Sequence, residues 1–217
     1  MKSFGVFLTI VILGLGASDA GAKKRHKGGQ SHANFDYYLL SLSWAPEYCA
    51  GHPNDNSAEC KTGNKTGFVL HGLWPQSNAG QPPMNCGPVR PVAADIVRRM
   101  RQYFPSASLI QHEWAKHGTC SGLSAADYFA KVEQAFKAVQ PPDQLRDLTK
   151  DQSLAVGDLE ANFASANHAP AEAFRTSCHN KELVSVDVCM TKDLQFQACS
   201  KSVRECPVTP LLVRAPK

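Results

Sequence analysis

Eight cysteines limit what this chain can fold into more than any other feature of its sequence. An even number of cysteines behind an apolar N-terminal segment predicts a disulfide framework formed in an oxidising compartment. On the order of a hundred pairings are possible, and the residues alone do not choose among them. The simplest bridge is Cys49–Cys60, because it would close a loop rich in Gly, Pro and Asn. The cysteines are Cys49, Cys60, Cys86, Cys120, Cys178, Cys189, Cys199 and Cys206, without the Cys-x-x-Cys pattern of a zinc ribbon or a thioredoxin-type site.

Residues 1–22 have the pattern of a signal peptide. Lys2 gives the charged start, residues 4–15 form the apolar stretch, and Ala20-Gly21-Ala22 is a small-residue cleavage site. We therefore expect a secreted or periplasmic protein with no stable membrane insertion after cleavage. The alternative is an uncleaved membrane anchor, for which the apolar stretch is short.

A cluster of basic residues follows the predicted cleavage site. The chain has a formal net charge of +4, and Lys2 and Asp19 cancel within the leader, so the mature chain keeps that charge. Lys23, Lys24, Arg25 and Lys27 account for all of it. The remaining domain is formally neutral, so its bulk charge gives no argument for nucleic-acid binding. We interpret residues 23–34 as a flexible, solvated arm, although contact with anionic lipid, cell wall or RNA is open.

Helical and strand patterns alternate irregularly along the rest of the chain. The length of 217 residues and a hydrophobic content of 43% allow one sizeable domain. Without an internal repeat or a linker, residues 35–217 are expected to form one α+β domain. Strands are expected at 37–44, 68–70, 182–190 and 195–199, and helices at 92–104, around 112–120, at 128–139 behind a capping box at Ser124, at 143–149 and at 153–167.

The segment from His112 to Cys120 contains the strongest signal of chemistry. If it is helical, His112, Glu113, Lys116 and His117 share one face, because each residue turns the chain by about 100°. Glu113 and His117 are also neighbours four residues apart. A carboxylate beside an imidazole holds the ring and stabilises its protonated form. This pattern predicts a site for proton transfer beside a negatively charged group.

Two other interpretations of this helix are open. A zinc protease helix has histidines four residues apart, whereas His112 and His117 are five apart, so a shared ion is not favoured. Alternatively, the polar face could simply be solvated, with Trp114 as an anchor.

A second segment, residues 67–76, supplies what the first one lacks. His71 follows a short apolar strand, Gly72 allows the backbone to turn freely, and Trp74-Pro75 would form a rigid aromatic corner. Taken alone, His71 would be a structural histidine. Paired with His117, it makes an acid and a base for cleavage of RNA by its own 2′-hydroxyl, with Lys116 and a protonated His112 offsetting the charge. Neither a metal nor another cofactor is needed, and DNA would be inert.

The two segments, 68–75 and 112–120, resemble the two active-site segments of the ribonuclease T2 family. Residues 38–49 are similar to the family's first strand, and the resemblance covers most of residues 35–206. It implies a disulfide-bonded α+β domain with a central antiparallel sheet flanked by helices. It also implies an endoribonuclease that cleaves single-stranded RNA through a 2′,3′-cyclic phosphate to a 3′-phosphate. We expect the enzyme to be metal-independent and monomeric.

The resemblance also implies a role for each site residue. His117 would be the base and His71 the acid, Glu113 and Lys116 would support the transition state, His112 would hold phosphate, and Trp74 and Gln76 would contact the base. The implied disulfides are Cys86–Cys120, Cys178–Cys206 and Cys189–Cys199, which leave Cys49–Cys60. Gln76 and Leu109 differ from the Asp and the aromatic residue of some members, which puts base preference in doubt, and we expect low base specificity.

A second function belongs to a different class. The chain could be a secreted binding module on a ribonuclease scaffold, acting without turnover. Retention of His71, Glu113, Lys116 and His117 argues against it, since binding alone does not require all four.

Overall fold

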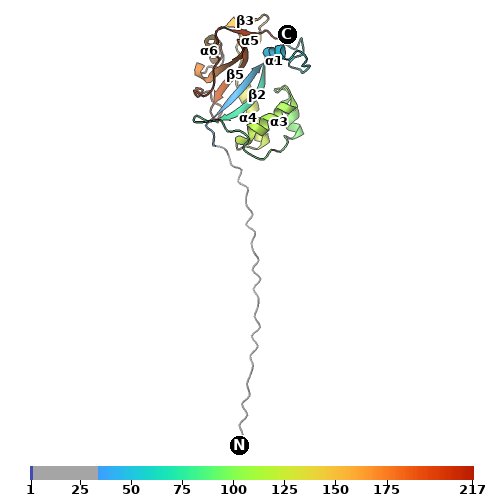
Figure 1. Cartoon of the computed structure of the whole chain (residues 1–217), viewed down its shortest axis with the longest axis vertical. Helices are drawn as coiled ribbons and strands as arrows, with labels where there is room; N and C mark the ends of the chain where they lie inside the picture. Colours follow the sequence, from blue (N-terminus) through green and yellow to red (C-terminus); the bar gives the residue numbers. More distant parts are fainter. Residues whose placement is uncertain (2–33) are drawn as a thin grey trace.

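The computed structural model describes Met1 and residues 34–217, which form one mixed sheet with surrounding helices (Figure 1). The strands are β1 (Tyr37–Trp44), β2 (Phe68–Gln76), β3 (Gln152–Leu154), β4 (Phe174–His179), β5 (Glu182–Met190) and β6 (Leu211–Val213). The α-helices are α1 (Ala45–Gly51), α2 (Ala94–Met100), α3 (Ala107–Lys116), α4 (Ala125–Ala138), α5 (Asp143–Arg146) and α6 (Val156–Asn167), and two short 3-10 helices are η1 (Gly118–Cys120) and η2 (Ala171–Ala173).

The sheet has the order β2-β1-β5-β6-β3, and β4 pairs with β5. All strand pairs are antiparallel except β5 with β6, which meet at the single pair Glu182–Leu212. The predicted α+β fold with a central, mainly antiparallel sheet is therefore confirmed. The strand predicted at 37–44 matches β1 at both ends.

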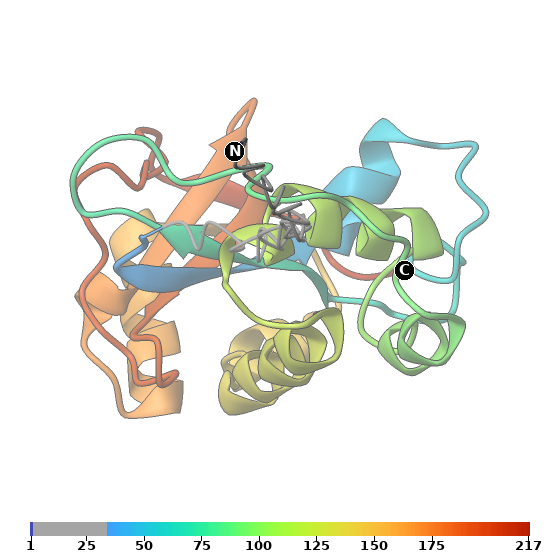
Figure 2. The same cartoon turned by 90° about the horizontal axis from the view of Figure 1, so that it is seen from below.

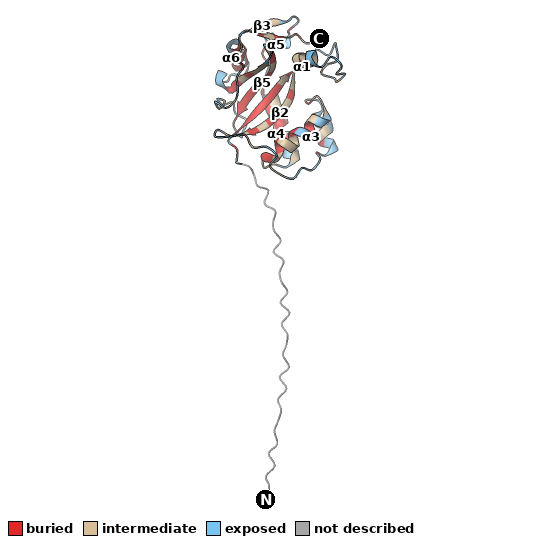
Figure 3. Ribbon diagram, in the orientation of Figure 1, coloured by how far each residue is buried: buried red, intermediate tan, exposed pale blue. Residues whose placement is uncertain are grey.

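Alternation along β1 separates the hydrophobic core from the other face of the sheet. Tyr38, Leu40, Leu42 and Trp44 belong to the main core, together with apolar residues of α4 and α6. Figure 2 shows α4 on one side of the strands, and Figure 3 shows the strands as the most buried part. Helix α3 lies beside β2 at the edge of the sheet, where its Ile110 belongs to the main core and its Trp114 contacts Tyr128 of α4.

Several predicted elements need correction. The helix expected at 153–167 begins at Val156, because residues 152–154 form β3 and pair with β6. Residues 195–199 do not form a strand; they make one bridge, Phe196 to Met190, within the loop that Cys189–Cys199 closes. The strand that forms a hairpin with β5 is instead β4, which precedes it in the chain. Helix α2 is shorter than expected, and the end of α1 occupies the start of the expected loop between Cys49 and Cys60.

Four disulfides cross-link the described chain: Cys49–Cys60, Cys86–Cys120, Cys178–Cys206 and Cys189–Cys199. They are the pairs that loop closure and the family resemblance indicated. Within the described residues, no helix is long and apolar enough to cross a bilayer. The expected leader (1–22) and arm (23–34) lie outside the described residues, apart from Met1 and Asn34 at their ends.

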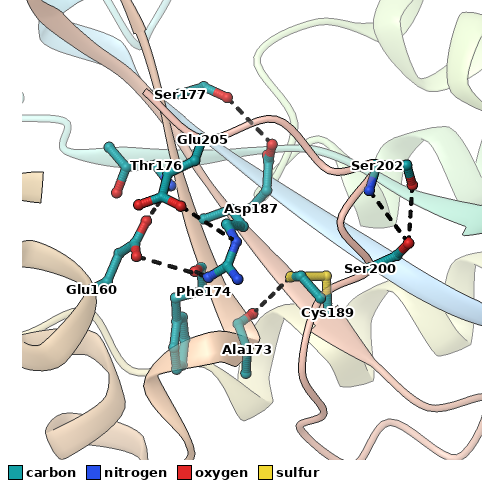
Figure 4. The surroundings of a disulfide bond; sticks show 12 residues. Glu160, Ala173, Phe174, Thr176, Ser177, Asp187, Cys189, Ser200, Ser202 and Glu205 are labelled. Carbon is teal, nitrogen blue, oxygen red and sulfur yellow. Dashed lines mark hydrogen bonds and ion pairs between the residues drawn. A yellow bond between two sulfur atoms is a disulfide. The ribbon is translucent and has the colours of Figure 1, made fainter. Parts of the chain in front are cut away.

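A buried carboxyl, that of Asp187, lies on the face of the sheet opposite the main core, because its neighbours Val186 and Val188 in β5 belong to that core. Figure 4 shows Asp187 beside Ser177. Asp187 of β5 is 8% exposed, and the hydroxyls of Ser177 and Ser185 each donate to it at 3.4 Å. Burial raises the pKa of Asp187 to about 6, and hydrogen bonds from Ser41, Ser177 and Ser185 only partly oppose this shift. The folded state therefore favours the protonated acid.

We predict that Asp187→Asn changes how stability depends on pH. The pKa of Asp187 is raised above its unfolded value, so the folded state favours the protonated acid. The contribution of this acid to the free energy of unfolding is complete below about pH 4 and is lost as pH rises through about 6. Two pKa units correspond to about 3 kcal/mol. Urea denaturation at pH 4 and pH 8 should show the variant gaining about 2–3 kcal/mol relative to wild type between the two pH values.

The matched control is Asp193→Asn in the exposed turn after β5, which should leave the pH dependence unchanged. A stability difference between Asp187→Asn and wild type that stays constant with pH would contradict the prediction.

Candidate active site

One cavity of about 390 Å³ brings together all the predicted site residues. It lies between β2 and α3, and its wall is completed by Leu39, Pro82 and Val203. The predicted residues that line it are His71, Trp74, Gln76, His112, Glu113, Lys116 and His117. The two sequence segments therefore line one cavity.

The backbone around His71 differs from the expectation. Gly72 does not form a turn and Trp74-Pro75 does not form a corner, because β2 runs unbroken from Phe68 to Gln76. The irregularity is a β-bulge: Ser41 pairs with Gly72 and Leu42 with Leu70, which leaves His71 as the extra residue. A bulge re-aims a side chain without ending the strand. It explains how a histidine in an edge strand is directed into the cavity.

Gly72 is required by close packing. A β-carbon at this position would overlap Glu113 Oε2 and would lie 2.5 Å from Trp74 Nε1. Its φ is not in the left-handed region, so conformational freedom is not the reason for glycine here. The missing side chain leaves the space in which Glu113 of α3 reaches the sheet.

Glu113 is the buried centre of the site. It is 1% exposed, and the Trp74 indole N–H donates to its Oε2 at 2.6 Å. Its Oε1 lies 3.8 Å from His71 Nε2. Burial raises the pKa of Glu113 to about 7, although the Trp74 hydrogen bond and Lys116 act in the opposite direction. At mildly acidic pH this carboxyl is protonated and can donate a hydrogen bond.

His117 follows the last residue of α3 and is also buried. It is 7% exposed, its ring stacks on Trp74 at 5.1 Å, and its Nδ1 has no hydrogen-bond partner among the described residues. Burial lowers the pKa of His117 to about 3, and Lys116, His112 and His71 contribute in the same direction. The ring is therefore neutral over most of the acidic range, which suits a proton acceptor.

His71 is more accessible than His117, with 42% of its side chain exposed. Ser43 Oγ lies 3.1 Å from its Nδ1, and the Trp74 ring meets it edge to face at 5.3 Å. Burial lowers the pKa of His71, and His112 and Lys116 make smaller contributions in the same direction. The pKa of His71 is lowered less than that of His117. Of the two rings, His71 therefore keeps a proton to higher pH.

The C-terminal end of α3 is anchored to the loop after β2. The Asn85 N–H donates to the carbonyl of Lys116 at 2.8 Å, the Cys86 N–H donates to Thr119 Oγ1 at 3.2 Å, and Cys86 is bonded to Cys120. Lys116 and His117 therefore keep a fixed position relative to β2. His112, one turn earlier, is exposed at the cavity rim.

A second cavity of about 690 Å³ adjoins the first and shares His71 and His112 with it. Ser43, Leu109 and the carboxylates of Asp55 and Glu59 also line it. Leu109 therefore faces this second cavity, whereas Gln76 faces the first. An extended ligand that occupied both cavities would pass His71.

Sequence reasoning missed Ser43 and the packing role of Gly72. Ser43 lies on the same face of β1 as Ser41, and its contact with His71 becomes visible only once the pairing of β1 with β2 is known. Among the described residues, no group of three or more His, Cys, Asp or Glu side chains could hold a metal ion.

Comparison with known proteins assigns the chain to a family. The model of the Ribonuclease T2 family matches residues 35–199. The chain belongs to the ribonuclease T2 family. A ribonuclease of Aeromonas hydrophila is 42% identical over 111 residues, which cover 51% of this chain and 49% of the relative, so the match spans about half of that protein. "Ribonuclease 3" of Arabidopsis thaliana is 30% identical over 203 residues, which cover 82% of this chain and 85% of the relative.

The fold is also shared with solved structures of the family. The crystal structure of RNase NT in complex with 5'-AMP matches with a TM-score of 0.68 at 20% identity, covering 85% of this chain and 100% of that chain. At this identity the likeness concerns the fold.

We predict that Gly72→Ala disrupts the centre of the site. The added β-carbon would displace Glu113 from Trp74 and leave a buried carboxyl without its donor, at a cost of about 1–3 kcal/mol. Urea denaturation should show this loss, and the Trp74 indole N–H resonance should shift in NMR spectra.

The matched control is Gly157→Ala in α6, where a β-carbon meets nothing within 4 Å. It should not lower stability. Equal stability of Gly72→Ala and wild type, with an unmoved indole resonance, would contradict the close-packing account.

Proposed function

We propose that the protein is a metal-independent endoribonuclease that cleaves single-stranded RNA to a 2′,3′-cyclic phosphate and then to a 3′-phosphate. The observation that carries the proposal is the single cavity in which two histidines of different proton affinity flank a buried carboxyl and a lysine. Membership of the ribonuclease T2 family supports the same reaction class.

In the first step, His117 accepts the proton of the ribose 2′-hydroxyl. The 2′-oxygen forms a bond to the adjacent phosphorus, and the bond from phosphorus to the 5′-oxygen breaks. His71 donates a proton to that departing oxygen. In the second step, His71 accepts a proton from water, and the water oxygen forms a bond to phosphorus as the bond from phosphorus to the 2′-oxygen breaks. His117 donates its proton to that 2′-oxygen, which leaves a 3′-phosphate and returns the enzyme to its starting protonation state.

The assignment of acid and base rests on the pKa directions. His117 has its pKa lowered to about 3 and is neutral in mild acid, whereas His71 holds its proton to higher pH. Since the pKa of His71 is below 6.5, the free enzyme should lose activity as pH rises through that lowered value. The pH optimum is therefore expected to be acidic.

Three side chains offset the negative charge that builds up on the phosphoryl oxygens. Lys116 contributes positive charge, and His112 at the rim is the phosphate-binding group. Glu113, protonated below about pH 7, can donate a hydrogen bond to a phosphoryl oxygen. Because Glu113 is held by Trp74, it needs no reorganisation during the reaction.

The base before the scissile phosphate is proposed to contact Trp74 and Gln76 in the first cavity. One face of Trp74 stacks on His117, so a base can use only the surface that His117 leaves free. The following nucleotide would occupy the second cavity beyond His71. Stacking and apolar contacts are sequence-tolerant, which supports low base specificity. The fold-related RNase NT was crystallised with 5'-AMP.

Other features remain part of the proposal. Four disulfides and the leader-like residues 1–22 support a secreted or periplasmic protein, with residues 23–34 as a basic arm and residues 35–217 as the catalytic domain. We propose a monomer that needs no cofactor.

We predict that His71→Ala and His117→Ala each lower kcat/KM on RNA by about 10²–10⁴-fold, since each removes one proton-transfer group. The measurement is initial-rate cleavage of a fluorogenic RNA, with and without EDTA. EDTA should have no effect, and strong inhibition would favour a metal mechanism instead.

His168→Ala is the matched control, because His168 caps the C-terminal end of α6 and does not line the cavity. Cleavage within tenfold of wild type in either active-site variant would overturn the assigned roles. RNA binding by the wild-type protein without turnover would favour the binding module instead.

A further inference from the structure

Ser43 contacts the histidine that is proposed to be the acid. We propose that Ser43 is a positioning residue, whose hydroxyl fixes the His71 ring so that Nε2 faces the reacting phosphate. The inference rests on the proposed function and extends it to a residue in a different strand, β1, outside both active-site segments.

The sheet places Ser43 beside the bulge that redirects His71. Ser43 pairs with Val69, and the bulge between Leu70 and Gly72 leaves His71 without a partner in β1. The freed ring meets Ser43 Oγ through Nδ1 at 3.1 Å. Within residues 34–217, this is the one hydrogen bond made by the His71 ring. A bulged residue has no ladder pairing to hold it, so this bond sets the direction of the ring.

The contact determines which nitrogen is available for chemistry. With Nδ1 turned to Ser43, Nε2 points to the cavity and lies 3.8 Å from Glu113 Oε1. When His71 is protonated, Nδ1–H can donate to Ser43 Oγ, which stabilises the imidazolium. The ring is then ready to give up the proton on Nε2. A histidine is oriented in this way when its second nitrogen has a fixed partner.

Other charged groups also act on this ring, and the test must keep them constant. From α3, Glu113, His112 and Lys116 face it, and His117 follows the same helix. Across the second cavity lie Tyr48, Asp55 and Glu59. None of these groups is altered by a substitution at Ser43, so a change in the titration of His71 reports the lost hydroxyl.

Ser43 also lines the second cavity, so its hydroxyl could instead contact the nucleotide that follows the scissile phosphate. The two roles differ in one respect. A 2′,3′-cyclic nucleotide has no following nucleotide, yet its hydrolysis still uses His71. A positioning residue affects both substrates, whereas a substrate contact affects only the dinucleotide.

The experiment compares Ser43→Ala, Ser43→Thr and Ser43→Val with wild type. Thr and Val have the same shape and differ in the hydroxyl, so this pair decides the question even if Ser43→Ala folds poorly. We expect Ala and Val to lower kcat by about tenfold on both a dinucleotide and a cyclic nucleotide, with KM within about twofold, and Thr to restore most of the rate. The alkaline limb of the pH profile should move to lower pH in Ala and Val.

Ser177→Ala is the matched control: it removes a hydroxyl that donates to Asp187 on the same sheet without touching His71, and its kcat should match that of wild type. NMR titration of the histidine rings reports the His71 pKa and tautomer without catalysis. It therefore separates failure of this inference from failure of the proposed function, which would appear as a wild-type protein that does not cleave RNA. An unchanged titration, or a loss confined to the dinucleotide KM, would overturn the positioning role.

Discussion

The hydrogen bond from the Trp74 indole to Glu113 holds the site together. It joins β2 to α3 at 2.6 Å, and it exists because Gly72 leaves room for the carboxyl to reach the sheet. The same indole stacks on His117 and meets His71 edge to face. One buried carboxyl and one aromatic ring therefore fix the separation of the two histidines. The Cys86–Cys120 bridge and the hydrogen bond from Asn85 to Lys116 hold the end of α3 against the loop after β2.

Burial at this contact also sets the proton affinities. Removing Glu113 and His117 from water raises the pKa of the acid and lowers that of the imidazole, because each is pushed towards its neutral form. His71, at the cavity entrance, is less affected. Burial, together with the neighbouring charges, thus gives two identical side chains different pKa values.

Local patterns in the sequence predicted much of this arrangement. Helical spacing was sufficient to place four polar residues on one side of a cavity: His112, Glu113, Lys116 and His117. A single apolar run was sufficient to predict β1. The missed features depend on distant partners. Strands β3 and β6 are three residues each and are stabilised by each other across the chain, so neither has a periodic signal of its own. The role of Gly72 was misinterpreted because it depends on the space that Glu113 and Trp74 occupy in the folded protein, which no local pattern shows.

The chemistry of the cut ends tests the central claim most directly. A defined single-stranded RNA is digested with the purified protein, and the fragments are analysed by mass spectrometry over time. The account predicts 2′,3′-cyclic phosphate ends at early times, converted later to 3′-phosphate ends, with a 5′-hydroxyl on the other fragment. Fragments with 5′-phosphate and 3′-hydroxyl ends would contradict it, because attack by the 2′-hydroxyl cannot produce them.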